Sequence, residues 1–247
     1  MSVLIVVPTY NERENLPLLV PQVRQAAPSA ELLIVDDNSP DGTGRLADEM
    51  AAEDPAIHVL HRAAKEGLGR AYVAALSWGL ERGYERLLHM DADLSHDPQY
   101  LPALLAASRT HDLAVGSRYV PGGGTRNWGP GRRLLSRFGS LYARTILGVP
   151  LRDLTGGFRC WRRHVLEDIG LDSVRSNGYS FMVEMAYRAY LRGHSIIEVP
   201  IVFPDRTDGK SKMSKKIILE AMIMVWKLRA QAGAIRAAEP AARREAA

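Results

Sequence analysis

Two aspartates, Asp91 and Asp93, stand one residue apart at the end of the apolar run formed by residues 87–90. A short apolar run of this kind predicts a buried strand, so both carboxylates lie where a strand gives way to a loop. Ionised carboxylates are oxygen acceptors, which Mg²⁺ and Mn²⁺ prefer as ligands. Open α/β sheets bind their ligands at the carboxyl ends of the strands. The pair therefore predicts a divalent-metal site that a substrate phosphate can share.

Three further polar clusters also follow apolar runs, at residues 8–12 (PTYNE), 35–42 (VDDNSPDG) and 116–119 (GSRY). A single acidic turn is often only a helix cap, and for residues 36–39 alone that interpretation and a ligand site are evenly balanced. The carboxyl ends of parallel strands meet at one edge of a sheet. Four such clusters at one edge favour a ligand-binding site.

The elements that must position these clusters alternate along the first half of the chain. Strands are predicted at residues 3–7, 31–35, 57–61, 86–90 and 112–116, with helices at 14–26, 43–53 and 68–82 and another after Pro98. Apolar runs that alternate with amphipathic helices are typical of βαβ units. We expect an α/β fold with a mostly parallel central sheet covered by helices on both faces.

The second half is less regular. Residues 121–124 (PGGG) predict a flexible loop, residues 131–147 a helix with a basic start, residues 196–203 a strand and residues 215–229 an amphipathic helix. The length of 247 residues fits one large domain, which we place at residues 1–236. The Ala-, Arg- and Glu-rich segment 237–247 predicts a disordered tail.

Composition narrows the class of protein. A net charge of +4 and a pI near 9.3 suit a nucleotide, a phosphate-bearing substrate or an anionic membrane surface. The charge is too weak to indicate nucleic-acid binding, and no motif supports it. Cys160 is the only cysteine, so an intramolecular disulfide is impossible and a cytoplasmic location is expected. No apolar stretch reaches the roughly 18 residues of a membrane span.

The motifs together resemble a known family. PTYNERENL, IVDDNSPDGT, MDADLSHDP and GSRY are similar to the motifs of family 2 glycosyltransferases, which have the Rossmann-like GT-A nucleotide-sugar fold. The downstream segments 153–159 (DLTGGFR) and 203–212 (FPDRTDGKSK) are most similar to the polyprenyl-phosphate (dolichol-phosphate) mannosyltransferases of that family. The resemblance extends from about Ser2 to about Trp226.

The resemblance implies a set of donor-binding residues. Those near the base and ribose would be Pro8, Tyr10, Glu12, Val35 and Asp37. Asp91 and Ala92 would contact the nucleotide, and Asp93 would be the main ligand of a Mg²⁺ or Mn²⁺ ion, with Asp91 beside it. Ser95 stands where similar proteins often have Gln, and its shorter side chain implies an indirect metal contact or a water in its place. His89 and His96 flank these carboxylates, and a structural role for both is favoured over metal ligation.

The basic residues divide between donor and acceptor. Arg206 offers a planar guanidinium and Lys212 a point charge, and both suit the diphosphate of the donor. Gly209 would let their loop fold over it. On the acceptor side, the resemblance implies that Arg118 and Arg132 bind the phosphate of a polyprenyl monophosphate.

The implied reaction transfers mannose from GDP-mannose to the polyprenyl phosphate, with inversion to a β-linked product and release of GDP. The catalytic residues would be Asp93, Arg118, Arg206 and Lys212. The acceptor phosphate is already largely anionic near neutral pH, so no general base is required. Because the acceptor lies in a membrane, we expect the protein at the cytoplasmic face, docked through residues 215–229 or through a membrane-anchored partner protein.

Three alternatives remain at this point. A polyprenyl-phosphate glucosyltransferase that uses UDP-glucose would have nearly the same phosphate-binding residues. An enzyme that adds a sugar to a polysaccharide or a protein would need a positioned base, which the sequence does not reveal. A catalytically silent nucleotide-sugar-binding subunit is disfavoured by the intact residues Asp91, Asp93, Arg206 and Lys212.

Overall fold

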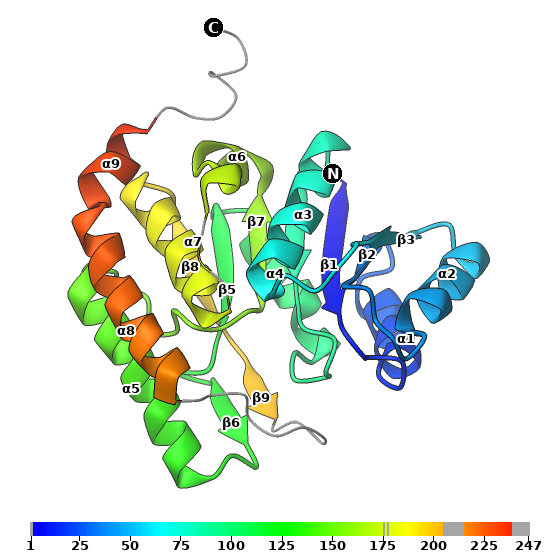
Figure 1. Cartoon of the computed structure of the whole chain (residues 1–247), viewed down its shortest axis with the longest axis horizontal. Helices are drawn as coiled ribbons and strands as arrows, with labels where there is room; N and C mark the ends of the chain where they lie inside the picture. The colour runs from blue at the N-terminus through cyan, green and yellow to red at the C-terminus, as the bar shows by residue number, and fades with distance from the viewer. Residues whose placement is uncertain (1, 175, 177, 205–214, 239–247) are drawn as a thin grey trace, which may run out of the picture.

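The computed structural model describes residues 2–174, 176, 178–204 and 215–238 (Figure 1). Seven of the described strands form a central sheet in the order β3-β2-β1-β4-β7-β5-β8. They are β1 (Val3–Thr9), β2 (Glu31–Asp36), β3 (Ile57–His61), β4 (Arg86–His89), β5 (Leu113–Ser117), β7 (Arg159–Arg162) and β8 (Ile196–Pro200). β7 is antiparallel to its neighbours β4 and β5, and the other pairings are parallel. The predicted α/β class with a mostly parallel sheet is confirmed.

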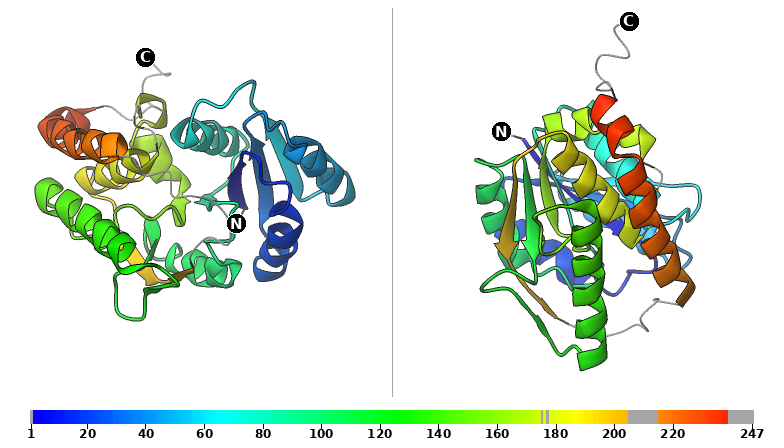
Figure 2. Two further views of the ribbon diagram at one scale, coloured as in Figure 1. Left: turned by 60° about the horizontal axis from the view of Figure 1, so that its bottom comes forward. Right: turned by 90° about the vertical axis from the view of Figure 1, so that its left-hand side faces the viewer.

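Helices cover both faces of this sheet (Figures 1 and 2). The bounds are α1 (Leu16–Ala26), α2 (Thr43–Glu53), α3 (Leu68–Glu81), α4 (Leu101–Ala107), α5 (Pro130–Leu147), α6 (Arg163–Asp168), α7 (Tyr179–Leu191), α8 (Lys215–Ala230) and α9 (Ala232–Ala237). Short 3₁₀ helices occupy Pro98–Tyr100 and Leu171–Ser173. The helices predicted in the first half and at 131–147 and 215–229 match these bounds to within about two residues, the usual uncertainty of helix ends.

Strand β1 shows how the sequence builds the two cores. It is buried along its whole length, and its side chains alternate between the two faces of the sheet. Ile5 packs in the core that α1 and α4 cover, whereas Leu4 packs in the core that α3, α6 and α7 cover. A strand buried on both faces reads as a continuous apolar run, which is why the VLIVVP segment predicts it so clearly.

A third layer lies at one end of the sheet. Helices α5 and α8 pack on each other and on α7, away from β2 and β3 (Figure 2). Their contact is apolar, with Leu147 of α5, Tyr187 of α7 and Leu228 of α8 all buried. This layer leaves much of the outer surface of α5 and α8 exposed.

Several elements were not predicted. β7 inserts antiparallel between β4 and β5, and α6 and α7 follow it. The predicted strand at 196–203 is two strands, because β8 belongs to the large sheet while β9 (Val202–Pro204) pairs with β6 (Gly124–Arg126). The prediction of a flexible loop over residues 121–124 is wrong at Gly124, which opens β6. The tail proposed for 237–247 lies largely outside the described residues and stays a prediction.

Candidate active site

The polar clusters after β1, β2 and β4 lie together at one edge of the sheet. β1 is the middle strand of the three, with Pro8 opposite Val35 and Val6 opposite His89 in the register. The residues that follow these strands therefore leave the sheet side by side. The sequence prediction that these clusters share one edge agrees with this geometry. Arg118, after β5, lies farther along the same edge.

The donor-side residues are held by local partners. Asp37 is buried and forms an ion pair with Arg62. Burial raises the pKa of Asp37, and the guanidinium of Arg62 opposes that rise. The ammonium group of Lys65 lies over the ring of Tyr10 in a cation–π contact, with Nζ 3.4 Å from the ring centroid. Glu12 is half-buried, and its Oε2 accepts a hydrogen bond of 2.6 Å from Asn15.

Asp91 and Asp93 follow β4 and are oriented by hydrogen bonds. The hydroxyl of Tyr72, on α3, donates to Oδ1 of Asp91 at 2.9 Å. The backbone nitrogen of Asp91 donates to Nδ1 of His96 at 2.8 Å. Both the backbone nitrogen and the hydroxyl of Ser95 donate to Oδ1 of Asp93. These bonds fix the two carboxylates before any ligand arrives.

This donor set fits Mg²⁺ or Mn²⁺. Two carboxylates after one strand supply hard oxygen ligands, and an ion bound by only two carboxylates keeps positions for water and phosphate oxygens. The side chain of Asp91 is 24% exposed, so it remains accessible. Ser95 is buried with its hydroxyl on Asp93, so the structure gives it an orienting contact to the carboxylate.

The two histidines near the carboxylates pack in the interior. His89 is fully buried, and burial lowers its pKa well below the usual value, which keeps the ring neutral. Its ring lies between those of Tyr72 and Trp161. His96 is also buried and stacks on Phe158. These contacts favour the structural interpretation of both histidines.

Arg118 forms a buried ion pair with Asp153. Its Nε and Nη2 donate to the two carboxylate oxygens of Asp153, each at 2.7 Å, and Nη2 also donates to Thr155 at 2.9 Å. Burial alone would raise the pKa of Asp153, but the charge and hydrogen bonds of Arg118 outweigh it and lower the pKa below the ordinary value. Arg118 would therefore bind the acceptor phosphate, as predicted, with a guanidinium whose charge Asp153 already balances.

Arg132 stands in the first turn of α5 and stacks on Trp128, with its Cζ 4.1 Å from the ring centroid. The indole is 6% exposed and lies edge-on to Phe203. Trp128 therefore forms a platform for the guanidinium of Arg132 at the start of α5.

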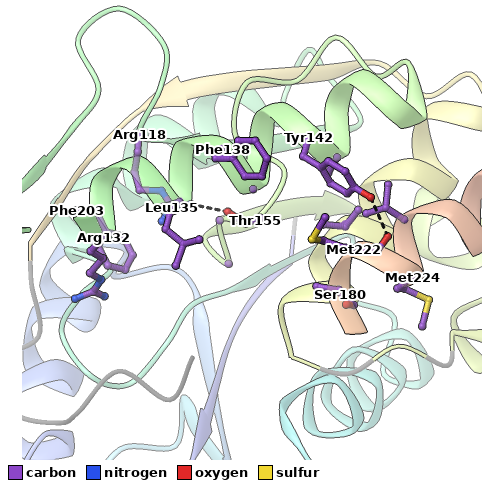
Figure 3. A pocket seen from close by; sticks show the side chains of 18 of the residues that line it. Arg118, Arg132, Leu135, Phe138, Tyr142, Thr155, Ser180, Phe203, Met222 and Met224 are labelled. Carbon is purple, nitrogen blue, oxygen red and sulfur yellow. Dashed lines mark hydrogen bonds between the residues drawn. The ribbon is translucent and has the colours of Figure 1, made fainter. Parts of the chain in front are cut away.

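Asp91, Arg118 and Arg132 line one end of a cavity of about 370 Å³. Helices α5 and α8 supply an apolar wall that extends from Leu135, beside the two arginines, toward Met222 and Met224 (Figure 3). Its residues are Leu135, Phe138, Tyr142, Met222, Met224, Val225 and Leu228. The hydroxyl of Tyr142 bonds the backbone oxygen of Met222 at 3.3 Å and joins the two helices. The cavity therefore has a charged end and a long apolar wall, and the predicted metal ligand Asp91 is among its lining residues.

Two predicted site residues cannot be placed. Arg206 and Lys212, together with Gly209, lie outside the described residues. Their roles at the diphosphate stay predictions. β9 ends at Pro204, and α8 begins at Lys215.

Sequence reasoning missed several residues that shape the site. Tyr72, Arg62, Trp128 and Asp153 each hold a predicted residue in place, yet none belongs to a polar cluster after a strand. Asp153 belongs to the DLTGGFR segment, which carries part of the family resemblance. An acidic residue within a Gly-rich segment is a signal in the sequence, but it does not reveal that Arg118 is the partner of Asp153.

The fold is that of a glycosyltransferase. The model of the glycosyl transferase family 2 matches residues 4–170, and the chain belongs to that family. The resemblance of its motifs to this family is confirmed.

Two relatives are similar over nearly the whole chain. The undecaprenyl-phosphate mannosyltransferase of Micrococcus luteus is 52% identical over 239 residues, which cover 96% of this chain and 98% of the relative. The polyprenol monophosphomannose synthase of Mycolicibacterium smegmatis is 54% identical over 231 residues, which cover 92% and 87%.

Solved structures share the fold at low sequence identity. Glucosyl-3-phosphoglycerate synthase from Mycobacterium tuberculosis, in complex with Mn²⁺, UDP and its glucosylated product, superposes with a TM-score of 0.66 at 17% identity, covering 92% of this chain and 79% of that one. A mannosyltransferase from Pyrobaculum calidifontis with GDP-mannose and Mn²⁺ gives a TM-score of 0.55 at 19% identity, covering 99% and 78%. The GT-A fold predicted from the motifs is confirmed.

Proposed function

We propose that this chain is a polyprenyl-phosphate mannosyltransferase that moves mannose from GDP-mannose to a polyprenyl monophosphate. The names and the high identity of the two bacterial relatives support both the sugar and the class of acceptor. GDP as the nucleotide and inversion at the sugar are finer proposals, which rest on the resemblance of the motifs to this family, and the metal rests on the carboxylates of Asp91 and Asp93.

The cavity between α5 and α8 carries this proposal. Its charged end, with Arg118 and Arg132, suits a phosphate, and Asp91 of the predicted donor site lines the same cavity, while its apolar wall suits an isoprenoid chain. A polysaccharide acceptor brings many hydroxyl groups, each of which needs a polar partner once it is buried. Phe138 and Leu135 offer none. A lipid phosphate is therefore the acceptor that fits both ends of the cavity.

The donor would lie across the ends of β1, β2 and β4. Tyr10, Glu12 and Asp37, with Pro8 and Val35 behind them, would hold the nucleoside. Asp93, with Asp91, would hold Mg²⁺ or Mn²⁺, which supplies charge neutralisation at the leaving diphosphate. Mn²⁺ in the related complexes supports this class of ion. Arg206 and Lys212, which precede α8 in the sequence, would add positive charge.

The chemical step needs orientation more than a base. An oxygen of the acceptor phosphate attacks C1 of mannose, the bond from C1 to the diphosphate oxygen breaks, and GDP leaves with that electron pair. Attack from the opposite face inverts the anomeric carbon. Arg132 would place the attacking phosphate, while the hydrogen bonds of Tyr72 and Ser95 fix the carboxylates that face the diphosphate.

Delivery of the acceptor requires contact with a bilayer. Among the described residues, no helix is long and apolar enough to cross a membrane. The outer faces of α5 and α8 carry exposed apolar side chains, among them Leu134 at 72% and Trp226 at 59%. Arg133 and Arg137 stand beside them on α5. Peripheral docking on the cytoplasmic face, directly or through a membrane-anchored partner, would place the cavity at the lipid.

The test mixes purified protein, Mg²⁺ and a short polyprenyl phosphate with radiolabelled GDP-mannose or, separately, UDP-glucose, and counts label in the organic phase. Transfer from GDP-mannose supports the proposal. Transfer from UDP-glucose alone would replace the donor. Donor binding without any transfer, in detergent that disperses the acceptor, would indicate a silent subunit.

Asp93→Ala is the matched variant for this assay. It removes a carboxylate that lies at the end of β4, outside the apolar core, so we expect an unchanged circular dichroism spectrum and loss of transfer. Appreciable transfer by the folded variant would contradict the assignment of Asp93 as the main metal ligand.

A further inference from the structure

A second cluster of metal-binding side chains lies at the opposite edge of the sheet from the candidate active site. Asp112 immediately precedes β5, His164 lies in α6, and His194 follows α7. One ligand atom from each residue can be chosen so that the three lie within 4.8 Å of one another. Arg118, at the other end of β5, is six residues from Asp112, or about 20 Å along an extended strand. The cluster is therefore separate from Asp91 and Asp93.

Asp112 is the fixed centre of this cluster. Its Oδ2 accepts hydrogen bonds from the backbone nitrogen of Ser195 at 2.9 Å and from the Ser195 hydroxyl at 2.8 Å. Its Oδ1 lies 3.1 Å from Nε2 of His164. The two oxygens thus face different partners, and the carboxylate cannot rotate without breaking the bonds to Ser195.

His194 presents one ring nitrogen to Asp168 and the other to Asp112. Its Nε2 lies 2.9 Å from Oδ2 of Asp168, which fixes the proton on that nitrogen. In the neutral ring the other nitrogen, Nδ1, then carries a lone pair, and it lies 3.9 Å from Oδ2 of Asp112. A metal ion between these two atoms would accept a lone pair from each of them.

The contact from Asp168 to His194 is also the arrangement that supports a metal-bound histidine. A carboxylate on the distal ring nitrogen fixes the tautomer and raises the basicity of the nitrogen that binds the metal. Asp168 is itself held by Arg192. Two imidazoles and one carboxylate are the donor set of many three-residue zinc sites, with water as the fourth ligand.

We infer that Asp112, His164 and His194 form a binding site for a borderline transition-metal ion, with Zn²⁺ as the best fit. Nitrogen and oxygen ligands of one zinc ion lie at most about 4.2 Å apart, twice the usual bond length. The three ligand atoms lie within 4.8 Å of one another, and the His164 side chain is 54% exposed, so its ring has room to turn toward a bound ion.

The surrounding charges set the selectivity of this site. Asp112 has Arg162 at 3.6 Å, and Asp168 is paired with Arg192, so both carboxylates are already balanced. A hard ion such as Mg²⁺, which depends on negative charge and oxygen ligands, gains little here. A metal ion that bonds well to imidazole nitrogen is favoured. The ion would join α6 to the segments that lead into β5 and β8.

Isothermal titration calorimetry of the full chain without an affinity tag tests this inference. ZnCl₂ is titrated in excess Mg²⁺, which occupies the carboxylates at the end of β4. We expect one equivalent of Zn²⁺ to bind, and bound Co²⁺ to show the visible absorption of a nitrogen-ligated ion. Absence of saturable binding below about 1 mM would overturn the inference.

Two variants separate this site from adventitious binding. His164→Gln keeps a hydrogen-bond donor toward Asp112 but removes the imidazole, and we expect it to weaken Zn²⁺ binding at least tenfold. The control is His61→Gln, because His61 is equally exposed at 52% and also contacts a single carboxylate, that of Asp48 at 2.8 Å. An equal loss in both variants, or no loss in His164→Gln, would refute the site. Mannosyl transfer should be unchanged in both.

Discussion

The buried pair of Arg118 and Asp153 makes a strong prediction about stability. Asp153 is fully buried, and its carboxylate accepts four hydrogen bonds from Arg118 and Gly156, counting both backbone and side-chain donors. The substitution Asp153→Asn keeps the shape but removes the negative charge. It removes the charge that Asp153 places against the guanidinium of Arg118, which is 8% exposed. The fully buried Arg159 lies near the same carboxylate and lowers its pKa as well.

Breaking a buried ion pair by removing one partner costs about 3–5 kcal/mol. Each kcal/mol lowers the melting temperature by about 2–4 °C in a chain of 150–250 residues. We therefore expect Asp153→Asn to lower the melting temperature by roughly 6–20 °C. Urea unfolding followed by circular dichroism gives the free energy directly, and differential scanning calorimetry gives the melting temperature.

The matched control is Glu167→Gln. Glu167 pairs with Arg163 at 2.6 Å on the surface of α6, with both side chains about one-third exposed. Loss of such an exposed pair should cost less than about 1 kcal/mol. A similar small cost for Asp153→Asn would refute the reasoning, because it would mean that the buried charge is solvated in some other way.

The pH dependence of this effect has a defined sign. The pKa of Asp153 is lowered in the folded state, so its stabilisation is fully present above the ordinary unfolded value of about 3.9. It is lost as the pH falls through the lower folded-state pKa. The stability difference between the native chain and Asp153→Asn should therefore shrink in strong acid and stay constant from pH 5 upward.

Three further predictions concern the reaction. Tyr72→Phe removes the hydrogen bond to Asp91 but keeps the buried ring, and we expect kcat/KM to fall about tenfold, at the low end for a bond to a charged group; an unchanged kcat/KM would contradict the positioning role of Tyr72. Arg132→Ala should raise the KM for polyprenyl phosphate about tenfold while calorimetry shows unchanged GDP-mannose binding. If affinity for both ligands falls equally, the acceptor-side role of Arg132 is wrong. Removal of divalent metal with EDTA should stop transfer, and excess Mg²⁺ or Mn²⁺ should restore it; full activity in EDTA would exclude a metal at Asp93.

The first half of the chain is the part whose fold can be predicted from local sequence patterns. Apolar runs such as residues 3–7 identify strands that are buried on both faces, and the parallel arrangement brings the clusters at Tyr10, Asp37 and Asp91 to one edge. Little tertiary information is needed for that step. In a parallel sheet, the residues that follow each strand lie at the same edge.

The remainder depends on contacts that leave no local signal. Strand β7 contains Arg159, which is fully buried because its guanidinium donates to the backbone oxygens of Leu154, Gly156 and Met182. A buried arginine breaks the apolar pattern by which strands are recognised. β6 and β9 have three residues each, too few for any periodicity.

The same limit applies to the site. Arg118 and Asp153 lie 35 residues apart, and Tyr72 lies 19 residues from Asp91. Their types and spacing carry no mark of these contacts. The cavity itself needs the packing of α5 against α8, which only the folded chain provides.

Photo-crosslinking tests the central claim, that the cavity between α5 and α8 receives the lipid of the acceptor. A polyprenyl phosphate with a diazirine in its isoprenoid chain is irradiated with the protein and GDP, and labelled peptides are mapped by mass spectrometry. We predict label within residues 130–147 and 219–230, which unlabelled polyprenyl phosphate prevents. Label confined to other segments, or label that competitor does not reduce, would contradict the claim.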